Sequence, residues 1–375
     1  MKIFVDCMPL SAGGGVQVAI AFLENLRRGG APFLAALPES LLTALPAALG
    51  EARDAGQIRT FPKRSAIDIV LAGGRLRSLE RAFKPDVTFT VFGPAYFRAR
   101  SPHLVGFALP NLIYPREGTF AGGRATRLTD ALRRRLFQRA DHLVVETEAA
   151  KRRLADLLGR RTEDVTVIGN SVNPFLRLCA ARPIPSQSAL ILVPSAYYPH
   201  KNLEFVPEVA RSMKEGGRGD AVFQLTLDPA SPAWRALVAR ASELGVGEMV
   251  TTLGIIRLDA LAEAYQQARL VFLPTLREVS TAVFPEAFQF RRPLVTSDLD
   301  FARELCGAAA EYIPPHDARR TAAALVTLLT DQRRAEELMK AGDRQLVSGY
   351  PTPEHKFELQ MALLERVAAG GRRGS

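Results

Sequence analysis

Two glutamates bracket one loop in the second half of the chain, in a position that suits the recognition of hydroxyl groups. Glu278 and Glu286 lie eight residues apart in the segment PTLREVSTAVFPEAFQF, directly after the apolar run Leu270–Leu273. Carboxylate oxygens accept hydrogen bonds from hydroxyls, and a bidentate pair can hold a vicinal diol. The spacing alone is common by chance, so the position after a buried-type strand carries the prediction.

Two further segments favour the binding of an anion. A helix is expected to begin near residue 284, because Pro285 is tolerated only in a first turn. Ser280 and Thr281 precede it, and free backbone N–H groups at a helix start favour phosphate or carboxylate oxygens. Lys201 lies at the start of another predicted helix, where the dipole gives a lysine no benefit. It is either an ordinary surface lysine or the partner of an incoming anion.

Three consecutive glycines, Gly13, Gly14 and Gly15, are predicted to form a turn between an apolar run at 2–7 and a helical pattern at 16–26. Such a turn lets a ligand approach the backbone closely. The segment SAGGGVQVA lacks the GxGxxG spacing of dinucleotide-binding turns, so a strained turn without a ligand is the alternative. The five histidines show no ligand spacing, so neither a metal nor another cofactor is expected.

Short apolar runs alternate with helical patterns in both halves of the chain. This alternation predicts an α/β fold with parallel sheets covered on both faces, arranged as two Rossmann-like domains that face a cleft. The expected boundaries are 1–178 for the first domain, 179–188 for a Pro- and Ser-rich linker, 189–350 for the second domain, and 351–370 for a last helix that returns to the first. Ligands of such sheets bind at the carboxyl ends of the strands, where the predicted loops lie.

The composition agrees with a two-domain globular protein. A chain of 375 residues exceeds the size of one comfortable core, and 47% hydrophobic with 23% charged residues excludes wholesale disorder. Cys7, Cys179 and Cys306 are far apart and odd in number, which indicates a reducing cytoplasm and no disulfide framework. No apolar run of about 18 residues is present, and the first residues are typical of a strand rather than a signal peptide.

The net charge of +10 lies entirely in the first half. Residues 1–180 hold 26 Lys and Arg against 16 Asp and Glu, whereas residues 181–375 hold 23 of each. Segment 65–83 mixes apolar and basic residues, and more arginines cluster between 124 and 153. The excess could reflect solvated helix faces, nucleic-acid binding or docking on an anionic membrane surface. Nucleic acid is not expected as a partner, because aromatics make up only 7% and no stacking module is visible.

Taken in order, these segments resemble glycosyltransferase family 4, the retaining glycosyltransferases of GT-B fold. The stretch DHLVVETEAAKRRL followed by VTVIGNSVNPF is similar to that family's strand, helix and "ipNgvd" segment. LILVPSAYYPHKN is similar to its "vGrl…KN" turn, and LREVSTAVFPEAF to the end of its E-x7-E segment. The resemblance covers roughly residues 141–330, while the first 140 residues match only through the glycine turn and the general pattern.

The resemblance implies a nucleotide-diphosphate sugar as donor, bound mainly by the second domain. Glu286 would hold the ribose diol, and Glu278 would hold hydroxyls of the transferred sugar. Lys201 would neutralise the diphosphate, helped by the backbone N–H groups of Ser280 and Thr281.

The resemblance further implies that Gly254 and Ile255 line the base pocket, and that the turn Gly13–Gly15 closes over the donor. The reaction would retain the anomeric configuration without a metal. Enzymes similar to this one often transfer to a glycan or lipid-linked acceptor in bacterial cell-surface polysaccharide or lipopolysaccharide synthesis. The first domain would then be the acceptor side of a peripheral enzyme at the inner face of the cell membrane.

Three positions depart from the family pattern. Ala196 stands where an arginine usually partners the lysine, the histidine often found after a first-domain strand is replaced near Ala108 in VGFALPN, and Val279-Ser280-Thr281 replaces Gly-Phe-Gly. Two alternatives therefore stay open: a non-catalytic homologue that binds nucleotide or glycan, and a nucleotide-sugar epimerase of the same architecture. The candidates for replacing the missing cationic and bridging groups are Arg277, His200 and Arg257.

Overall fold

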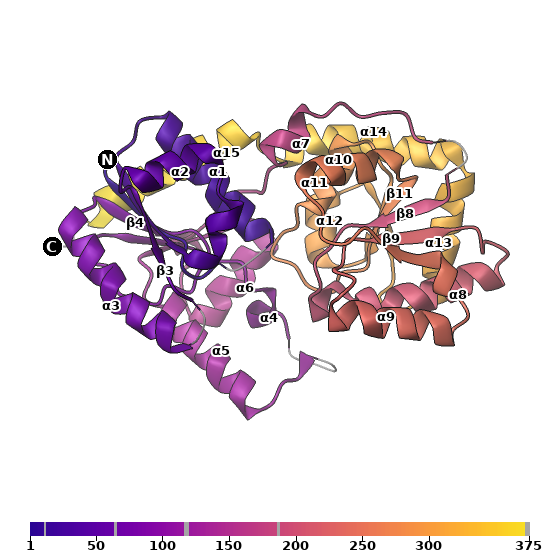
Figure 1. Cartoon of the computed structure of the whole chain (residues 1–375), viewed down its shortest axis with the longest axis horizontal. Helices are drawn as coiled ribbons and strands as arrows, with labels where there is room; N and C mark the ends of the chain where they lie inside the picture. Colours follow the sequence, from indigo (N-terminus) through magenta and orange to yellow (C-terminus); the bar gives the residue numbers. More distant parts are fainter. Residues whose placement is uncertain (11–12, 64–65, 116–119, 186–187, 372–375) are drawn as a thin grey trace. The chain divides into compact units, whose positions relative to one another are not determined.

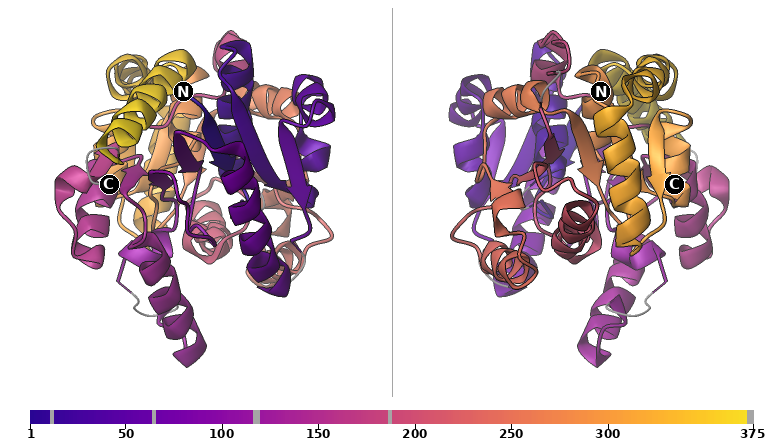
Figure 2. Two further views of the ribbon diagram at one scale, coloured as in Figure 1. Left: turned by 90° about the vertical axis from the view of Figure 1, so that its left-hand side faces the viewer. Right: turned by 90° about the vertical axis from the view of Figure 1, so that its right-hand side faces the viewer.

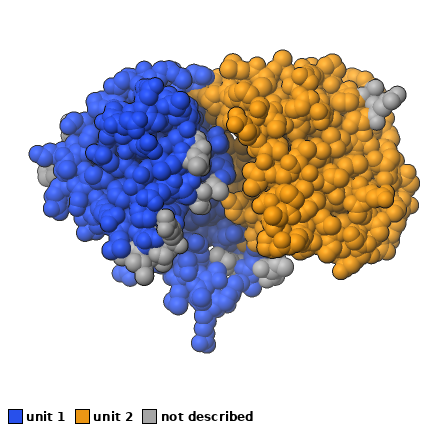
Figure 3. All heavy atoms as spheres, in the orientation of Figure 1, with its two compact units in different colours: residues 1–169, 354–375 blue, residues 170–353 orange. Residues whose placement is uncertain are grey.

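The computed structural model describes residues 1–10, 13–63, 66–115, 120–185 and 188–371. The chain divides into two compact units, which Figure 3 shows in two colours: unit 1 comprises residues 1–169 with 354–375, and unit 2 comprises residues 170–353. Each unit is built on one sheet of parallel strands with helices packed against it (Figure 1). This confirms the predicted α/β fold of two Rossmann-like units.

Unit 1 contains a seven-stranded sheet in the order β3-β2-β1-β4-β5-β6-β7. Its strands are β1 Ile3–Asp6, β2 Phe33–Pro38, β3 Ile58–Phe61, β4 Val87–Thr90, β5 His103–Gly106, β6 His142–Val145 and β7 Val165–Val167. Its helices are α1 Gly14–Arg28, α2 Ala47–Asp54, α3 Ala66–Phe83, α4 Pro110–Ile113, α5 Arg124–Phe137 and α6 Glu148–Leu158, with 3-10 turns at Glu39–Ala44 and Thr162–Asp164. The central strands β1, β4 and β5 are buried at every position, because helices cover both faces of the sheet there.

The last helix, α15 (Pro353–Gly371), belongs to unit 1 although it lies at the other end of the chain. Leu364 is fully buried in the unit 1 core, and Phe357 packs on Phe22 with ring centroids 5.6 Å apart. Lys356 Nζ donates to Glu146 Oε1 at 2.9 Å, in a pair that is largely shielded from solvent. The predicted return of the last helix to the first domain is confirmed.

Unit 2 contains a six-stranded sheet in the order β10-β9-β8-β11-β12-β13. Its strands are β8 Leu190–Val193, β9 Val222–Leu225, β10 Val250–Thr252, β11 Leu270–Leu273, β12 Leu294–Ser297 and β13 Ala310–Ile313. Its helices are α7 Pro174–Leu178, α8 Val206–Glu215, α9 Pro232–Glu243, α10 Leu258–Gln267, α11 Val283–Gln289, α12 Asp300–Cys306, α13 Ala318–Thr330 and α14 Gln332–Gly349. Three 3-10 turns complete the unit: Pro199–Lys201, Leu203–Phe205 and Gly247–Met249.

The boundary between the units lies earlier than the linker expected at 179–188. Unit 2 begins at Asn170, because α7 and the chain after it pack on the second sheet's helices. Gln289 Nε2 donates to the carbonyl oxygens of Arg177 and Cys179 at 3.2 and 3.3 Å. The buried guanidinium of Arg292 donates to Arg182 O at 3.1 Å. These bonds tie the Pro-rich stretch to unit 2 before the first strand of that unit.

The structure adds elements between residues 27 and 85 that sequence patterns do not predict, namely β2, β3, α2 and α3. It also starts α1 at Gly14, so two of the three glycines lie in the helix rather than in a turn. Among the described residues, no helix has both the length and the apolar character needed to cross a bilayer.

Candidate active site

The carboxyl edge of the unit 2 sheet, between β8 and β11, is the place where this fold favours a ligand. The two strands are neighbours, with Leu270 beside Ile191, yet the chain leaves β8 toward one side of the sheet and β11 toward the other. Loops diverge at such a switch point and open a crevice above the strands. Lys201 follows β8 and Glu278 follows β11, so the structure brings these two predicted residues to the same edge.

Lys201 and Glu278 form a buried ion pair. Lys201 Nζ donates to Glu278 Oε1 at 2.5 Å, and the two side chains are 13% and 5% exposed. Thr275 Oγ1 donates to the same carboxylate oxygen at 2.8 Å, and Leu276 N donates to His200 O at 2.8 Å. The ion pair and the backbone hydrogen bond join the loop after β8 to the loop after β11. The carboxylate of Glu278 is held in place by Lys201 and Thr275.

Glu286 is buried in the first turn of α11, where only 7% of the residue is exposed. Its Oε2 accepts a hydrogen bond from the hydroxyl of Tyr265 at 2.8 Å, and the Tyr265 ring stacks on Phe290 with centroids 5.0 Å apart. Burial raises the pKa of Glu286 to about 7, while the hydroxyl of Tyr265 opposes that rise. Near neutral pH this carboxyl is therefore balanced between its acid and its carboxylate form.

The cationic candidates differ in their surroundings. Arg277 is buried, and its charge acts on His200 together with that of Lys201. Burial first, and these two cations second, lower the pKa of His200 to about 4, so its ring is neutral at physiological pH. Arg257 is almost fully exposed and faces Asp259 at 3.5 Å. The charges of Arg277 and Lys201 thus both act on His200, whereas Arg257 is a solvent-exposed residue next to Asp259.

Ser280 and Thr281 lie in the loop that leads into α11, as the sequence predicts. Thr281 Oγ1 accepts from Val283 N at 3.3 Å. The hydroxyl of Ser280 is buried and has no hydrogen-bond partner among the residues that the structure describes. Helix α11 begins at Val283, one residue before the predicted position, with Pro285 in its first turn.

Gly254 and Ile255 follow β10 at the same carboxyl edge of the sheet. Gly254 has φ +75°, which favours glycine, and its N–H donates to Thr252 Oγ1 at 3.0 Å. Ile255 is 82% exposed, an unusual exposure for an isoleucine. A pocket formed by these two residues stays a prediction.

The glycine segment of unit 1 follows β1. Gly13 has φ +77°, and a Cβ on Gly15 would lie 3.2 Å from Leu10 Cδ2 and 3.3 Å from Phe92 Cδ2. Glycine adopts the positive φ of residue 13 without strain, and the close neighbours of Gly15 explain why a residue without a side chain stands there. Below the segment, Asp6 is fully buried; burial raises its pKa to about 6, and its Oδ1 accepts from Met8 N at 3.0 Å.

The described part of the chain offers no cluster of metal-ligating side chains. Within the described ranges, no group of three or more His, Cys, Asp or Glu side chains is placed to hold an ion. Asp298, the first residue of an Asp-Leu-Asp triplet, instead pairs with Arg303 at 2.7 Å.

The structure also identifies site residues that sequence patterns do not. Tyr265 lies in the last turn of α10 and is typical of a core aromatic, and Thr275 lies in the segment of the two glutamates at a position that their spacing does not mark. Their contacts with Glu286 and Glu278 depend on how separate elements pack together. The sequence offers one local indication of this contact. Tyr265 lies in a helix that is predicted to be buried, and a buried hydroxyl generally has a hydrogen-bond partner.

Two family models match the chain and together span most of it. The model of "Glycosyltransferase Family 4" matches residues 12–174, and that of "Glycosyl transferases group 1" matches residues 187–331. A curated relative, the α-D-kanosaminyltransferase of Streptomyces kanamyceticus, is 27% identical over 165 residues. That match covers 43% of this chain and 40% of the relative's length, so it spans less than half of either protein.

Solved structures share the fold over nearly the whole chain. Anabaena Alr3699/HepE, solved in complex with UDP and glucose, is 17% identical with a TM-score of 0.71, covering 98% of this chain and 100% of its own. WaaG, a glycosyltransferase involved in lipopolysaccharide biosynthesis, is 16% identical with a TM-score of 0.73, covering 96% and 99%. The matched models and this architecture lead to one conclusion: the chain is a glycosyltransferase of the GT-B fold and belongs to glycosyltransferase family 4.

Proposed function

We propose that this glycosyltransferase uses a nucleotide-diphosphate sugar, retains the anomeric configuration, and transfers the sugar to a glycan or lipid-linked acceptor in cell-surface polysaccharide synthesis. The observation that carries the proposal is the Lys201–Glu278 ion pair at the carboxyl edge between β8 and β11, with Glu286 in the adjoining helix. The complex of Alr3699/HepE with UDP and glucose and the described role of WaaG support the donor class and the setting.

The two members of the ion pair would act on different parts of the donor. Without a ligand, Lys201 and Glu278 neutralise each other at 2.5 Å. A diphosphate carries more negative charge than one carboxylate, so it would draw the ammonium group of Lys201 toward itself. Glu278 would then be available to accept hydrogen bonds from sugar hydroxyls. The backbone N–H groups of Ser280 and Thr281 would assist at the phosphate.

The reaction itself needs stabilisation of negative charge on the leaving group. The bond between the anomeric carbon and the diphosphate oxygen breaks, and its electron pair stays on that oxygen, where Lys201 and Arg277 would stabilise it. The sugar passes through an oxocarbenium-like state. The acceptor hydroxyl attacks from the same face, and its proton passes to the departing diphosphate. The acid and the base of this step belong to the two substrates, and Lys201 and Arg277 would supply the positive charge at the diphosphate in place of a metal.

A ligand screen tests the donor assignment. We expect one nucleoside diphosphate, from a panel with uracil, guanine, adenine, thymine and cytosine bases, to raise the Tm by about 5 °C or more at about 100 times its Kd. Its sugar conjugate should then be turned over with glycan or lipid-linked acceptors, even with a metal chelator present. Binding without turnover on any acceptor would favour a non-catalytic homologue, and conversion of the donor without an acceptor would favour an epimerase.

We further propose that unit 1 docks on an anionic membrane surface. Unit 1 holds 29 Lys and Arg against 19 Asp and Glu, and unit 2 holds 20 of each, so the whole excess belongs to unit 1. Helix α5 projects from the rest of this unit (Figure 2), with Leu128 72% and Leu132 58% exposed. Arg124, Arg127 and Arg135 lie on the same exposed side. Residue 65 of the predicted segment 65–83 lies outside the described residues, and the remainder forms α3.

Vesicle sedimentation tests this docking. The wild-type protein should sediment with vesicles that contain phosphatidylglycerol at low salt, because arginines attract the headgroups and the leucines enter the interface. The variant Leu128→Ser/Leu132→Ser should bind about ten-fold more weakly, since two apolar side chains are lost at unchanged charge. Wild-type protein that stays in the supernatant at low salt would contradict the proposal.

A further inference from the structure

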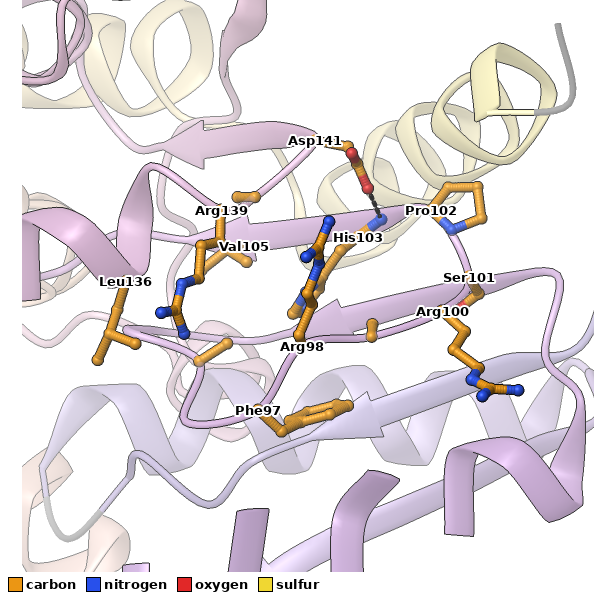
Figure 4. Close-up of a pocket in the computed structure, with 13 residues that line it drawn as sticks. Phe97, Arg98, Arg100, Ser101, Pro102, His103, Val105, Leu136, Arg139 and Asp141 are labelled. Atoms are coloured by element: carbon orange, nitrogen blue, oxygen red, sulfur yellow. Dashed lines mark hydrogen bonds between the residues drawn. The ribbon is translucent and has the colours of Figure 1, made fainter. Parts of the chain in front are cut away.

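A cavity of about 270 Å³ lies in unit 1, at the amino ends of β5 and β6. Figure 4 shows the side chains around it. Its walls come from the segment before β5, from the start of β5, and from the end of α5 with the turn into β6. The volume is slightly below the range usual for small-molecule sites. It would accept a phosphate or diphosphate group with a small carbon skeleton.

The cavity lies at the opposite edge of the sheet from the glycine segment of α1. The strands of unit 1 are parallel, so His103 and His142 begin at one edge, while Asp6 ends at the other. Four residues of a strand separate the two edges by roughly 13 Å. The cavity thus opens at the amino ends of β5 and β6, whereas this fold binds the ligands of its main reaction at the carboxyl edge, to which the cavity floor is linked through Thr90 and Asp6.

The charge around the cavity is strongly unbalanced. Arg98, Arg100 and Arg139 line it, and none of the three forms an ion pair within the part of the chain that the structure describes. Asp141 is the one carboxylate of the lining, and its Oδ2 accepts from His103 N at 2.7 Å. All three arginines are exposed to solvent, so together they give the mouth of the cavity a positive potential that favours an anion.

The floor of the cavity is held in place by hydrogen bonds. His103 is 5% exposed, its Nε2 lies 2.9 Å from Thr90 Oγ1, and that hydroxyl donates to Asp6 Oδ2 at 3.0 Å. A hydroxyl has one proton, so Thr90 accepts from His103 while it donates to Asp6. Burial lowers the pKa of His103 to about 4, which keeps the ring neutral and adds no positive charge.

The segment that carries Arg98 and Arg100 is fixed as well. The buried carboxylate of Glu80, on α3, accepts from Arg100 N at 3.0 Å and from Ser101 N at 2.9 Å. The hydroxyl of Ser101 lies 2.7 Å from that of Thr88 on β4. The backbone below the arginines is thus organised in advance, which lowers the entropy lost when their side chains bind a ligand.

We infer that this cavity is a second anion site, which binds a phosphate-bearing small molecule through Arg98 and Arg139 with Arg100 at its rim. Guanidinium groups bind phosphate oxygens in bidentate geometry, which makes arginine better suited than lysine to such a ligand. Phe97 and Val105 form a buried apolar part of the lining, against which the carbon part of a phosphate ester would pack. The phosphate could belong to a soluble metabolite or to a lipid headgroup.

Calorimetric titration of the full chain with inorganic pyrophosphate tests the site. The variant Arg98→Ala/Arg139→Ala should weaken binding at this site about ten- to hundred-fold, because it removes two charge-assisted contacts. The control Arg28→Ala/Arg152→Ala removes the same charge from exposed positions of unit 1 outside both the lining and helix α5, and it should bind as the wild type does. Equal binding by the two double variants would overturn the inference.

Two additions separate this site from the donor site and identify the source of the phosphate. In Lys201→Ala, pyrophosphate should still shift the ring NMR signals of His103, whatever becomes of the proposed donor site. The Arg98→Ala/Arg139→Ala variant should lose that shift. Vesicles of phosphatidylcholine with phosphatidic acid provide the lipid source: weaker sedimentation of this variant than of the control supports a headgroup ligand. Pyrophosphate binding with equal sedimentation supports a soluble one. Loss of the His103 shift in Lys201→Ala would contradict a separate site.

Discussion

Replacing Lys201 with alanine should lower kcat for sugar transfer by about 100- to 1000-fold. The ammonium group would stabilise the charge that develops on the departing diphosphate, and removal of one such preorganised group has a cost of this order. KM for the donor should change less, because the interaction strengthens as the bond breaks. Steady-state kinetics of the variant and the wild type measure both quantities. The control Arg211→Ala, an exposed residue of α8 in the same unit, should keep wild-type activity.

A loss of activity in Lys201→Ala must be separated from a loss of stability. The substitution leaves the buried Glu278 carboxylate without its cation, which costs about 3–5 kcal/mol of folding free energy. The double variant Lys201→Met/Glu278→Gln removes both charges together and should recover most of that stability. It should remain inactive. Activity close to wild type in either variant would show that the pair has no part in transfer.

Glu286→Gln should stabilise the protein above pH 7 and weaken donor binding at the same time. The folded-state pKa of Glu286, about 7, lies above the ordinary value of 4.5. The stability that this carboxyl contributes is therefore complete below pH 4.5 and is lost as the pH rises through 7. The loss amounts to about 3 kcal/mol, which a neutral glutamine avoids. Chemical denaturation at pH 4.5 and pH 8 should show a gain for the variant at pH 8 alone.

The same substitution should reduce donor affinity about ten- to hundred-fold at pH 8, because a carboxylate accepts from the ribose hydroxyls more strongly than an amide does. In the wild type, affinity should rise with pH and level off above about 7 as Glu286 becomes ionised. In Glu286→Gln it should be flat. The companion variant Tyr265→Phe removes the hydrogen bond that holds the pKa of Glu286 down, so its midpoint should move upward. If the donor affinity of Glu286→Gln depended on pH as strongly as that of the wild type, the titrating group would be a residue other than Glu286.

The positions of the site residues relative to their own helices and strands are predictable from the sequence, because they depend only on neighbouring residues in the chain. Pro285 limits where α11 can begin, and the apolar run of β11 places Glu278 in the loop that follows the strand. The alternation of strands and helices predicts two parallel sheets, and with them the neighbouring positions of β8 and β11 in this fold. These rules need no knowledge of side-chain packing.

Other features depend on packing and are not predictable in this way. The strand β2 has the sequence FLAALP, which lacks both alternation and β-branched residues, so neighbouring strands rather than propensity make it a strand. The raised pKa of Glu286 follows from burial beside Tyr265 and Phe290, which lie on α10 and after α11. The cavity in unit 1 joins arginines 41 positions apart, Arg98 and Arg139, around a histidine that sequence patterns do not mark.

The donor diphosphate is proposed to bind at the carboxyl edge between β8 and β11. Hydrogen exchange measured by mass spectrometry on the full chain, with and without the nucleoside diphosphate that raises Tm most, tests it directly. We predict slower exchange in residues 199–202 and 275–286, the two segments joined through the Lys201–Glu278 pair. Unchanged exchange in both segments under saturating ligand would contradict the claim.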